Sequence, residues 1–238
     1  MARTRMTRHQ LKEQDEITTS LQKLTEFIVA RKREVIAGAS AIVLVVLGIF
    51  GWNFYSARRN ANAQSELSQA IAIFNDTATI KSDKERYAKA LAEAQKTYDN
   101  YRSLPVGIIA EYYVALSKDG LGDTAGAVQS LQEVMQRGDP TIKSVAQFAL
   151  GGVHKKHGET QKAIEVYKQL YESGGYSKAA VGYELGSLHE ANNQLDQAKD
   201  YYQKVVSEFP DSPFRQEADA ALRRLGVAPA PPAAQKPS

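Results

Sequence analysis

The sequence predicts an all-α protein, in which one apolar helix precedes a stack of helical hairpins and a C-terminal capping helix. Three observations lead to this fold class. Eighteen consecutive residues without a formal charge run from Val35 to Trp52. Farther along the chain, a pattern of small residues recurs at intervals of 36 and 35 residues. The segments between turn residues are rich in Ala, Glu and Lys, with apolar residues spaced as on one face of a helix.

The composition limits the classes of function. The chain has 238 residues, a net charge of +3 and no cysteine. From Asn60 onward there are 20 basic and 22 acidic residues, so this part lacks the basic face expected of a nucleic-acid-binding domain. The absence of cysteine excludes disulfides, zinc-thiolate sites and cysteine nucleophiles. We therefore expect no nucleic-acid partner.

Residues 1–34 are predicted to form a basic cytoplasmic arm that contains an amphipathic helix. The first ten residues are basic and show no apolar periodicity. Beyond them, apolar residues recur at spacings of four, three and four, at Ile17, Leu21, Leu24 and Ile28. Two interpretations remain open: a helix that rests on the inner leaflet of a membrane, and a docking helix for a cytoplasmic partner.

Residues 35–55 are predicted to form a transmembrane helix, which would contact the lipid bilayer through Val35–Tyr55. At about 1.5 Å per residue, the uncharged run is roughly as long as the hydrocarbon core is thick. Four Lys and Arg residues lie close to its N-terminal side, against two, Arg58 and Arg59, on the other side. This bias predicts a single-pass inner-membrane protein with a cytoplasmic N-terminus and a periplasmic or other extracytoplasmic C-terminal domain. The alternative is a signal peptide cleaved near Ala61-Asn62-Ala63; the length of the apolar run favours a retained anchor.

The part beyond the apolar run is predicted to be a stack of helix pairs. Residues 61–104 form the first pair, interpreted as an opening repeat with a weaker pattern, and residues 105–212 hold three clearer repeats. Each of the three carries an alanine after its turn, at Ala127, Ala163 and Ala198. A small residue precedes each alanine by twelve positions, at Ala115, Gly151 and Gly186. Small residues at these two positions let the antiparallel helices of a hairpin approach closely, and larger side chains fill the space to the next pair. Residues 213–225 then form a capping helix, and residues 226–238 form a disordered Ala/Pro tail.

The pattern around Leu150-Gly151 and Leu185-Gly186 resembles the tetratricopeptide repeat, which implies an α-solenoid. Together with the short arm and the single apolar span, the chain resembles the YfgM-like family, the ancillary subunit associated with the bacterial Sec translocon. The resemblance implies an inner-membrane protein whose periplasmic repeats contact translocon subunits, periplasmic chaperones or newly exported chains.

The sequence offers little that could carry chemistry. His154 and His157 lie at a spacing of three on a helix, which could in principle hold a metal, but two lysines separate them. Solvent-facing histidines at a helix end are the simpler interpretation. His189 recurs 35 residues after His154, which favours a packing position for both. We expect no catalytic site, no cofactor and no metal, and we do not expect an enzyme.

Stacked hairpins offer a concave surface that is lined by their first helices. The position fifteen residues before each repeat alanine is aromatic in all three repeats. The predicted groove residues are Tyr112, Tyr113, Phe148, Lys155, Tyr183, Glu184 and Glu190. Aromatic anchors with scattered charges suit an extended peptide or a partner helix, although the aromatic residues could instead only pack between adjacent hairpins. The predicted function is a membrane-anchored protein–protein interaction scaffold of the bacterial cell envelope. Alternatives are an envelope-assembly factor for outer-membrane or cell-wall machinery, and an oligomeric secretion component.

Overall fold

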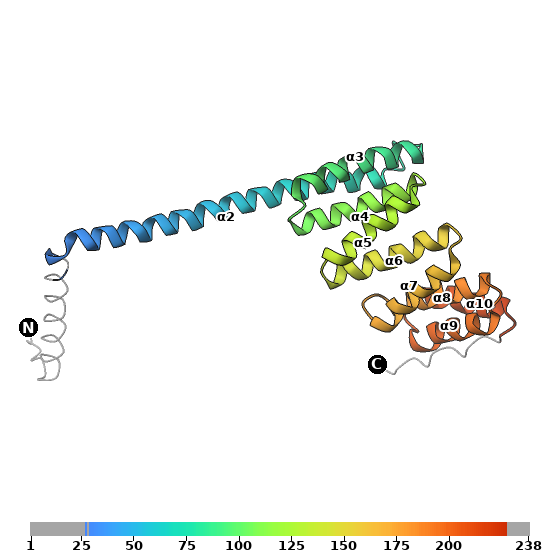
Figure 1. The fold of residues 1–238 in the computed structure, drawn as a ribbon. Helices are drawn as coiled ribbons and strands as arrows, with labels where there is room; N and C mark the ends of the chain where they lie inside the picture. Colours follow the sequence, from blue (N-terminus) through green and yellow to red (C-terminus); the bar gives the residue numbers. More distant parts are fainter. Residues whose placement is uncertain (1–26, 28, 228–238) are drawn as a thin grey trace, which may run out of the picture. The chain divides into compact units, whose positions relative to one another are not determined.

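The computed structural model describes residue 27 and residues 29–227, and the regular elements of this part are all helices (Figure 1). In chain order they are α2 (Lys32–Asn75), α3 (Asp83–Tyr101), α4 (Pro105–Gly120), α5 (Thr124–Arg137), α6 (Pro140–Lys156), α7 (Thr160–Ser173), α8 (Lys178–Ala191), α9 (Leu195–Glu208) and α10 (Phe214–Arg224). The sequence prediction of an all-α solenoid of hairpins is confirmed for this part.

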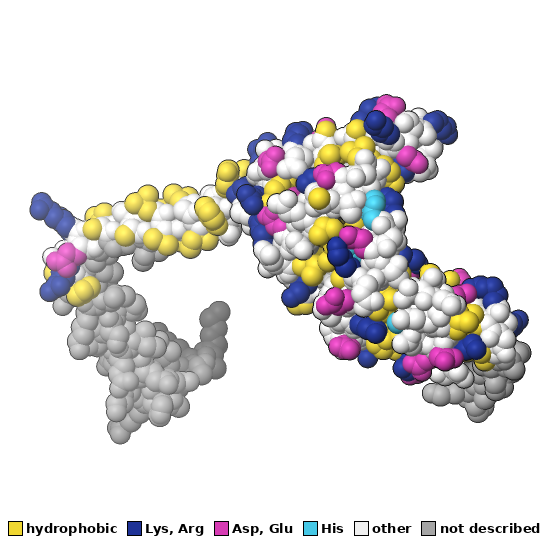
Figure 2. Space-filling model, turned by 45° about the vertical axis from the view of Figure 1, so that its right-hand side comes forward, with side chains coloured by type: hydrophobic (Ala, Val, Ile, Leu, Met, Phe, Trp, Pro, Cys, Tyr) yellow, Lys and Arg dark blue, Asp and Glu magenta, His cyan; other side chains and the backbone are white. Residues whose placement is uncertain are grey.

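The chain divides into two compact units. The first ends at Arg59 and the second begins at Asn60. In the first unit, α2 exposes its large apolar side chains, which Figure 2 shows in yellow along the helix. From Ile36 to Tyr55, eleven such side chains are between 44% and 70% exposed. Most of the predicted arm, residues 1–26 and residue 28, lies outside the described residues, as does the Ala/Pro tail from residue 228 onward.

Within the part of the chain that the structure describes, no helix is both long enough and apolar enough to span a membrane.

The helix α2 also differs in length from the predicted one. It continues without a break from Lys32 to Asn75, whereas the sequence predicts a span over residues 35–55 and a separate helix from residue 61. No Gly or Pro lies between Trp52 and Asn75 to end the helix. The transmembrane character of residues 35–55 stays a prediction.

In the second unit, consecutive helices pair as hairpins, and small residues set how closely they pack. A β-carbon on Gly151 of α6 would lie 2.6 Å from Cζ of Tyr167 in α7. The same contact recurs one repeat later, where a β-carbon on Gly186 would lie 2.6 Å from Cε1 of Tyr202. Both tyrosines are almost fully buried. The predicted close approach at these two glycines is therefore confirmed.

The turns within the three repeats share one backbone conformation. Each contains one residue with a positive φ: 87° at Gly122, 74° at Gly158 and 57° at Asn193. The amide of the next residue in each turn then donates to a carbonyl five residues earlier, with N···O distances of 2.9, 2.9 and 2.8 Å. This bond satisfies a carbonyl that the helix end leaves without a partner.

The last helix closes the array. Ala218, Ala221 and Leu222 of α10 pack with Tyr202 and Val205 of α9 in one apolar cluster. The opposite side of α10 carries exposed charged residues such as Glu217 and Arg223. A terminal repeat needs such a polar outer face, because no further hairpin covers it.

Candidate binding surface

The predicted groove aromatics of α6 and α8 contact the element that follows their own hairpin. The ring of Phe148 stacks on Tyr176, in the connection before α8, with centroids 4.4 Å apart and planes at 20°. The ring of Tyr183 lies 5.8 Å from that of Phe214 in α10. Both side chains are half-buried. Packing between adjacent hairpins, the alternative interpretation of these residues, accounts for these contacts.

The predicted groove aromatics of α4 lie beside each other. The rings of Tyr112 and Tyr113 meet edge to face at 5.6 Å, and Tyr113 makes a similar contact with Phe74 at 5.5 Å. Burial raises the pKa of Tyr112 to about 12. The hydroxyl of Tyr112 therefore stays protonated at neutral pH, as a group that can donate a hydrogen bond.

The predicted charged residues form two separate ion pairs. Lys155 Nζ lies 2.6 Å from Glu184 Oε2, so one pair joins α6 to α8. Glu190 accepts a hydrogen bond of 2.8 Å from the Tyr202 hydroxyl and lies 3.3 Å from Arg224 Nη2 of α10. The structure therefore brings Lys155 and Glu184 together, while Glu190 joins α8 to the capping helix.

The seven predicted groove residues thus all lie on the first helices α4, α6 and α8, but they do not form one continuous cluster of contacts. Tyr112 and Tyr113 form one pair, and Lys155 and Glu184 form another. Binding of a partner on this face stays a prediction.

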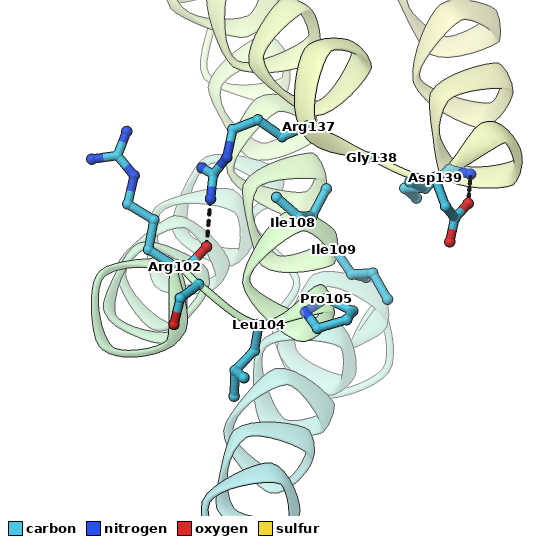
Figure 3. Close-up of a pocket in the computed structure, with 10 residues that line it drawn as sticks. Arg102, Leu104, Pro105, Ile108, Ile109, Arg137, Gly138 and Asp139 are labelled. Atoms are coloured by element: carbon cyan, nitrogen blue, oxygen red, sulfur yellow. Dashed lines mark hydrogen bonds between the residues drawn. The ribbon is translucent and has the colours of Figure 1, made fainter. Parts of the chain in front are cut away.

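A cleft that the sequence analysis did not identify lies between the first and second repeats (Figure 3). Its volume is about 480 Å³, and it is lined by the α3–α4 and α5–α6 connections and by the first turns of α4 and α6. The apolar residues that line it are Leu104, Pro105, Ile108, Ile109 and Ile142. The sequence signal that could have indicated this cleft is the pair of adjacent isoleucines at the start of α4, together with Ile142 at the start of α6.

Two arginines at one side of this cleft share one carboxylate. Arg137 Nη1 lies 2.7 Å and Arg102 Nη2 lies 3.0 Å from Glu133 Oε1. The hydrogen bond from the Tyr98 hydroxyl, and then those from the two arginines, hold the pKa of Glu133 below its ordinary value. Figure 3 shows Arg137 donating to the main-chain oxygen of Arg102 as well, which fixes the α3–α4 connection against the end of α5.

Comparison with known proteins places this architecture in a family. Residues 34–226 match the tetratricopeptide repeat-like domain, which is most of the chain. The protein belongs to this family. Stacked repeats of this kind present extended surfaces for binding other proteins. No curated protein matches the chain.

Solved structures share the fold of the repeat-like domain at low sequence identity. One is a putative kinesin light chain with nearly identical TPR-like repeats from Podosopora anserina. It is 16% identical with a TM-score of 0.56, over 69% of this chain and 85% of that one. Another is a tetratricopeptide repeat protein from Parabacteroides merdae, 16% identical with a TM-score of 0.50, over 68% of this chain and 60% of that one. These similarities concern the fold alone.

The histidines of the repeats hold the turns that follow their helices. His154 Nδ1 lies 2.5 Å from Glu159 Oε2, and His189 Nδ1 lies 2.6 Å from Gln194 Oε1. Both rings are buried, so the packing interpretation describes them, and the solvent-facing interpretation was wrong for His154. In the described part of the chain, no cluster of three or more His, Cys, Asp or Glu residues could hold a metal ion.

Proposed function

We propose that this protein is a protein–protein interaction scaffold, and that its partner binds on the face formed by α4, α6 and α8. The match of residues 34–226 to the repeat-like family carries this proposal, because stacked repeats use such a face to bind extended segments of other proteins. The Lys155–Glu184 pair and the adjacent rings of Tyr112 and Tyr113 supply charged and aromatic groups on these helices.

In this proposal the protein binds its partner and catalyses no reaction. The contacts of the histidines, which are the side chains best suited to act as a general base, support this part of the proposal. His154 and His189 are bonded through Nδ1 to side chains of their own turns. His157 lies 2.8 Å from Asp119 and joins α6 to α4. Each of these three imidazoles therefore has a structural partner. His157 also lies 3.2 Å through Nδ1 and 3.1 Å through Nε2 from the hydroxyl of Thr124, so the start of α5 takes part in the same contact.

We also propose that residues 35–55 hold the scaffold at a lipid bilayer, with the N-terminus in the cytoplasm and the repeats outside it. The exposure of large apolar side chains around this part of α2 supports the proposal, since an apolar surface of this extent is costly in water and marks a membrane or protein contact. The Lys and Arg bias of the flanking segments supports the orientation. The resemblance noted above makes translocon subunits, periplasmic chaperones or exported chains candidate partners; envelope-assembly machinery and secretion complexes are the alternatives.

Site-specific photocrosslinking tests the binding face. A photoreactive residue replaces Ser187, which lies beside the Lys155–Glu184 pair, in the full-length protein in cells. The matched control carries it at Lys168, an exposed residue of the second helix α7. We expect a partner to crosslink from position 187 and not from position 168. Equal crosslinking from both positions would exclude the assigned face.

Fractionation tests the bilayer contact separately. We expect the full-length protein to stay with the membrane pellet in alkaline carbonate and a variant without residues 1–56 to become soluble. A reporter active only outside the cytoplasm, fused after Ser238, is expected to be active. Release of the full-length protein by carbonate would contradict the anchor while leaving the crosslinking result intact.

A further inference from the structure

The cleft between the first and second repeats is an apolar site that the chain itself leaves open. It lies at the N-terminal ends of α4 and α6 (Figure 3), whereas the Lys155–Glu184 pair lies near the C-terminal end of α6. Ile109 and Ile142 are half-buried on its walls. The cleft is therefore separate from the binding face proposed above.

One repeat farther along the array, the connection between the hairpins packs an aromatic side chain on α6. Aligning Gly151 with Gly186 places Tyr176 at the position of Thr141. The four residues before α8 are not helical, and the Tyr176 ring stacks on Phe148 of α6 with centroids 4.4 Å apart. The preceding Gly175 lies so close to α6 that a β-carbon on it would collide with Oγ of Ser144. The connection before α8 thus covers the N-terminal half of α6 with an aromatic side chain.

The connection before α6 cannot do the same for α4. It consists of Gly138 and Asp139, and α6 already begins at Pro140. The Asp139 carboxylate accepts hydrogen bonds from the amides of Thr141 and Ile142, at 2.8 and 3.0 Å, and this cap holds the first turn as helix. Thr141 is exposed on that turn and does not reach α4 as Tyr176 reaches α6. The open volume over Ile108 and Ile109 is the consequence.

The charges beside the cleft favour a bound segment that carries an acidic residue next to the side chain in the cleft. Arg102 and Arg137 carry two positive charges against the single carboxylate of Glu133. The carboxylate of Asp139 is committed to the N-terminus of α6. The Arg102 side chain remains 63% exposed although it is paired with Glu133, so a second carboxylate can approach it and form charge-assisted hydrogen bonds.

We propose that the cleft binds an aromatic side chain from an extended segment of a partner protein, with an acidic residue next to that aromatic. The aromatic ring lies against Ile108, Ile109 and Ile142, as Tyr176 lies against α6 at the next interval. The acidic side chain pairs with Arg102. The protein then has two contact regions for partners, one on the face of its first helices and one at their N-terminal ends.

Methyl NMR on the full-length protein, with isoleucine δ1 carbons labelled, tests this site. The probe is the peptide acetyl-Gly-Asp-Tyr-Asp-Gly-amide, titrated to concentrations at which a dissociation constant of about 1 mM is visible. We expect saturable shifts of the Ile108, Ile109 and Ile142 methyl signals. The Ile164 methyl, buried within the second hairpin, is the internal reference and should not shift.

Matched peptides and variants separate the two parts of the proposal. Replacing the peptide tyrosine by alanine should abolish the shifts, and replacing both aspartates by lysine should weaken binding about tenfold. Arg102→Gln should weaken binding of the parent peptide to a similar degree, while Arg223→Gln, an exposed arginine of α10, should leave it unchanged. Absence of saturable shifts at the three isoleucines, or equal shifts with the alanine peptide, would overturn the site. Equal binding of the lysine peptide would overturn the acidic specificity.

Discussion

The second and third repeats, α6–α7 and α8–α9, have nearly the same backbone and differ in chemistry. Both turns use one residue of positive φ, Gly158 in the first and Asn193 in the second. Both place a buried histidine against the side chain that follows the turn. In one the partner is the carboxylate of Glu159, and in the other it is the amide of Gln194. The geometry of the turn is thus a property of the backbone, whereas its response to pH depends on one side chain.

The two hairpins also differ in how firmly their central tyrosine is held. Tyr202 donates a hydrogen bond of 2.8 Å to Glu190, which also pairs with Arg224 of the capping helix. Tyr167 packs against Phe148 with ring centroids 5.3 Å apart. A ring held by packing can shift by a few tenths of an ångström at lower cost than a ring whose hydroxyl is also fixed. The two repeats should therefore tolerate the same substitution differently.

The largest expected effect comes from adding side chains at the close helix contacts. Gly151→Val and Gly186→Val would each place a β-carbon 2.6 Å from a tyrosine ring. We expect each to lower the free energy of unfolding by about 2–3 kcal/mol, as overpacking does, with the larger loss at Gly186 because Tyr202 is fixed by Glu190. Urea unfolding followed by circular dichroism measures it.

The control for this prediction is Gly152→Ala. A β-carbon there would lie 3.7 Å from the Tyr167 hydroxyl, an ordinary contact. Alanine in place of a helical glycine should stabilise by about 0.5–1 kcal/mol. An equal loss for Gly151→Val and Gly186→Val would show that the Tyr202–Glu190 bond does not restrain the ring.

Removing the two histidines should give a smaller difference between the repeats. His189 is 2% exposed and stacks on Tyr201, with ring centroids 5.5 Å apart and planes at 6°. His154 is 8% exposed and pairs with a partly exposed Glu159. We expect His189→Ala to cost about 2 kcal/mol, from the cavity and the lost hydrogen bond, and His154→Ala to cost about half of that. The same unfolding assay measures both. A larger loss of unfolding free energy for His154→Ala than for His189→Ala would contradict the greater contribution expected of His189.

Most of the hairpin packing could be predicted from the sequence, because it repeats. Ala127, Ala163 and Ala198 are all fully buried, and the small residues opposite them meet the next helix as expected. Contacts within a hairpin follow from residue spacing on two adjacent helices, and three copies of the same spacing reinforce one another.

Contacts between hairpins could not be predicted in the same way. The stacking of Tyr176 on Phe148 depends on the longer connection before α8, and the cleft beside Ile109 depends on the shorter connection before α6. The lengths of these connections differ between the repeats, so the repeat pattern does not predict them. For the same reason the seven predicted groove residues share the first helices, but their contacts, such as that of Glu190 with α10, were not foreseen.

Exchanging the acceptors of the two turns tests the electrostatic difference. Hydrogen bonds from Lys162 and then from His154 hold the pKa of Glu159 below its ordinary value, which is about 4.3. A carboxylate with a lowered folded pKa stabilises the fold above the unfolded pKa, and this contribution is lost as the pH falls through the folded pKa. We therefore expect Glu159→Gln to be less stable than the parent at pH 7 and equally stable at a pH below the lowered value.

The reciprocal variant, Gln194→Glu, should create a similar pH dependence in the third repeat. A carboxylate at position 194 would face the His189 Nδ1 that the Gln194 amide oxygen now contacts at 2.6 Å. The residue equivalent to Lys162, which donates to Glu159, is Gln197, so this carboxylate would have no lysine at that position. The pH dependence should therefore be weaker than that of Glu159. Urea unfolding at a series of pH values measures both variants. A Glu159→Gln difference that persists unchanged into acid would show that the charge of Glu159 contributes nothing to the turn.

The smallest effect concerns the residues of positive φ in the two turns. Asn193 has a φ of 57° and Gly158 a φ of 74°, a region that costs an ordinary L-residue about 1 kcal/mol and costs Asn less. Asn193→Gly removes this strain but adds freedom to the unfolded chain, so the net change should stay within about 0.5 kcal/mol. Gly158→Ala has no such compensation, because alanine lacks the local hydrogen bond that lets Asn adopt this conformation, and it should cost about 1 kcal/mol. If Gly158→Ala were neutral in the unfolding assay, the turn would not require positive φ, and the shared backbone of the two repeats would have to arise from the helix packing on either side.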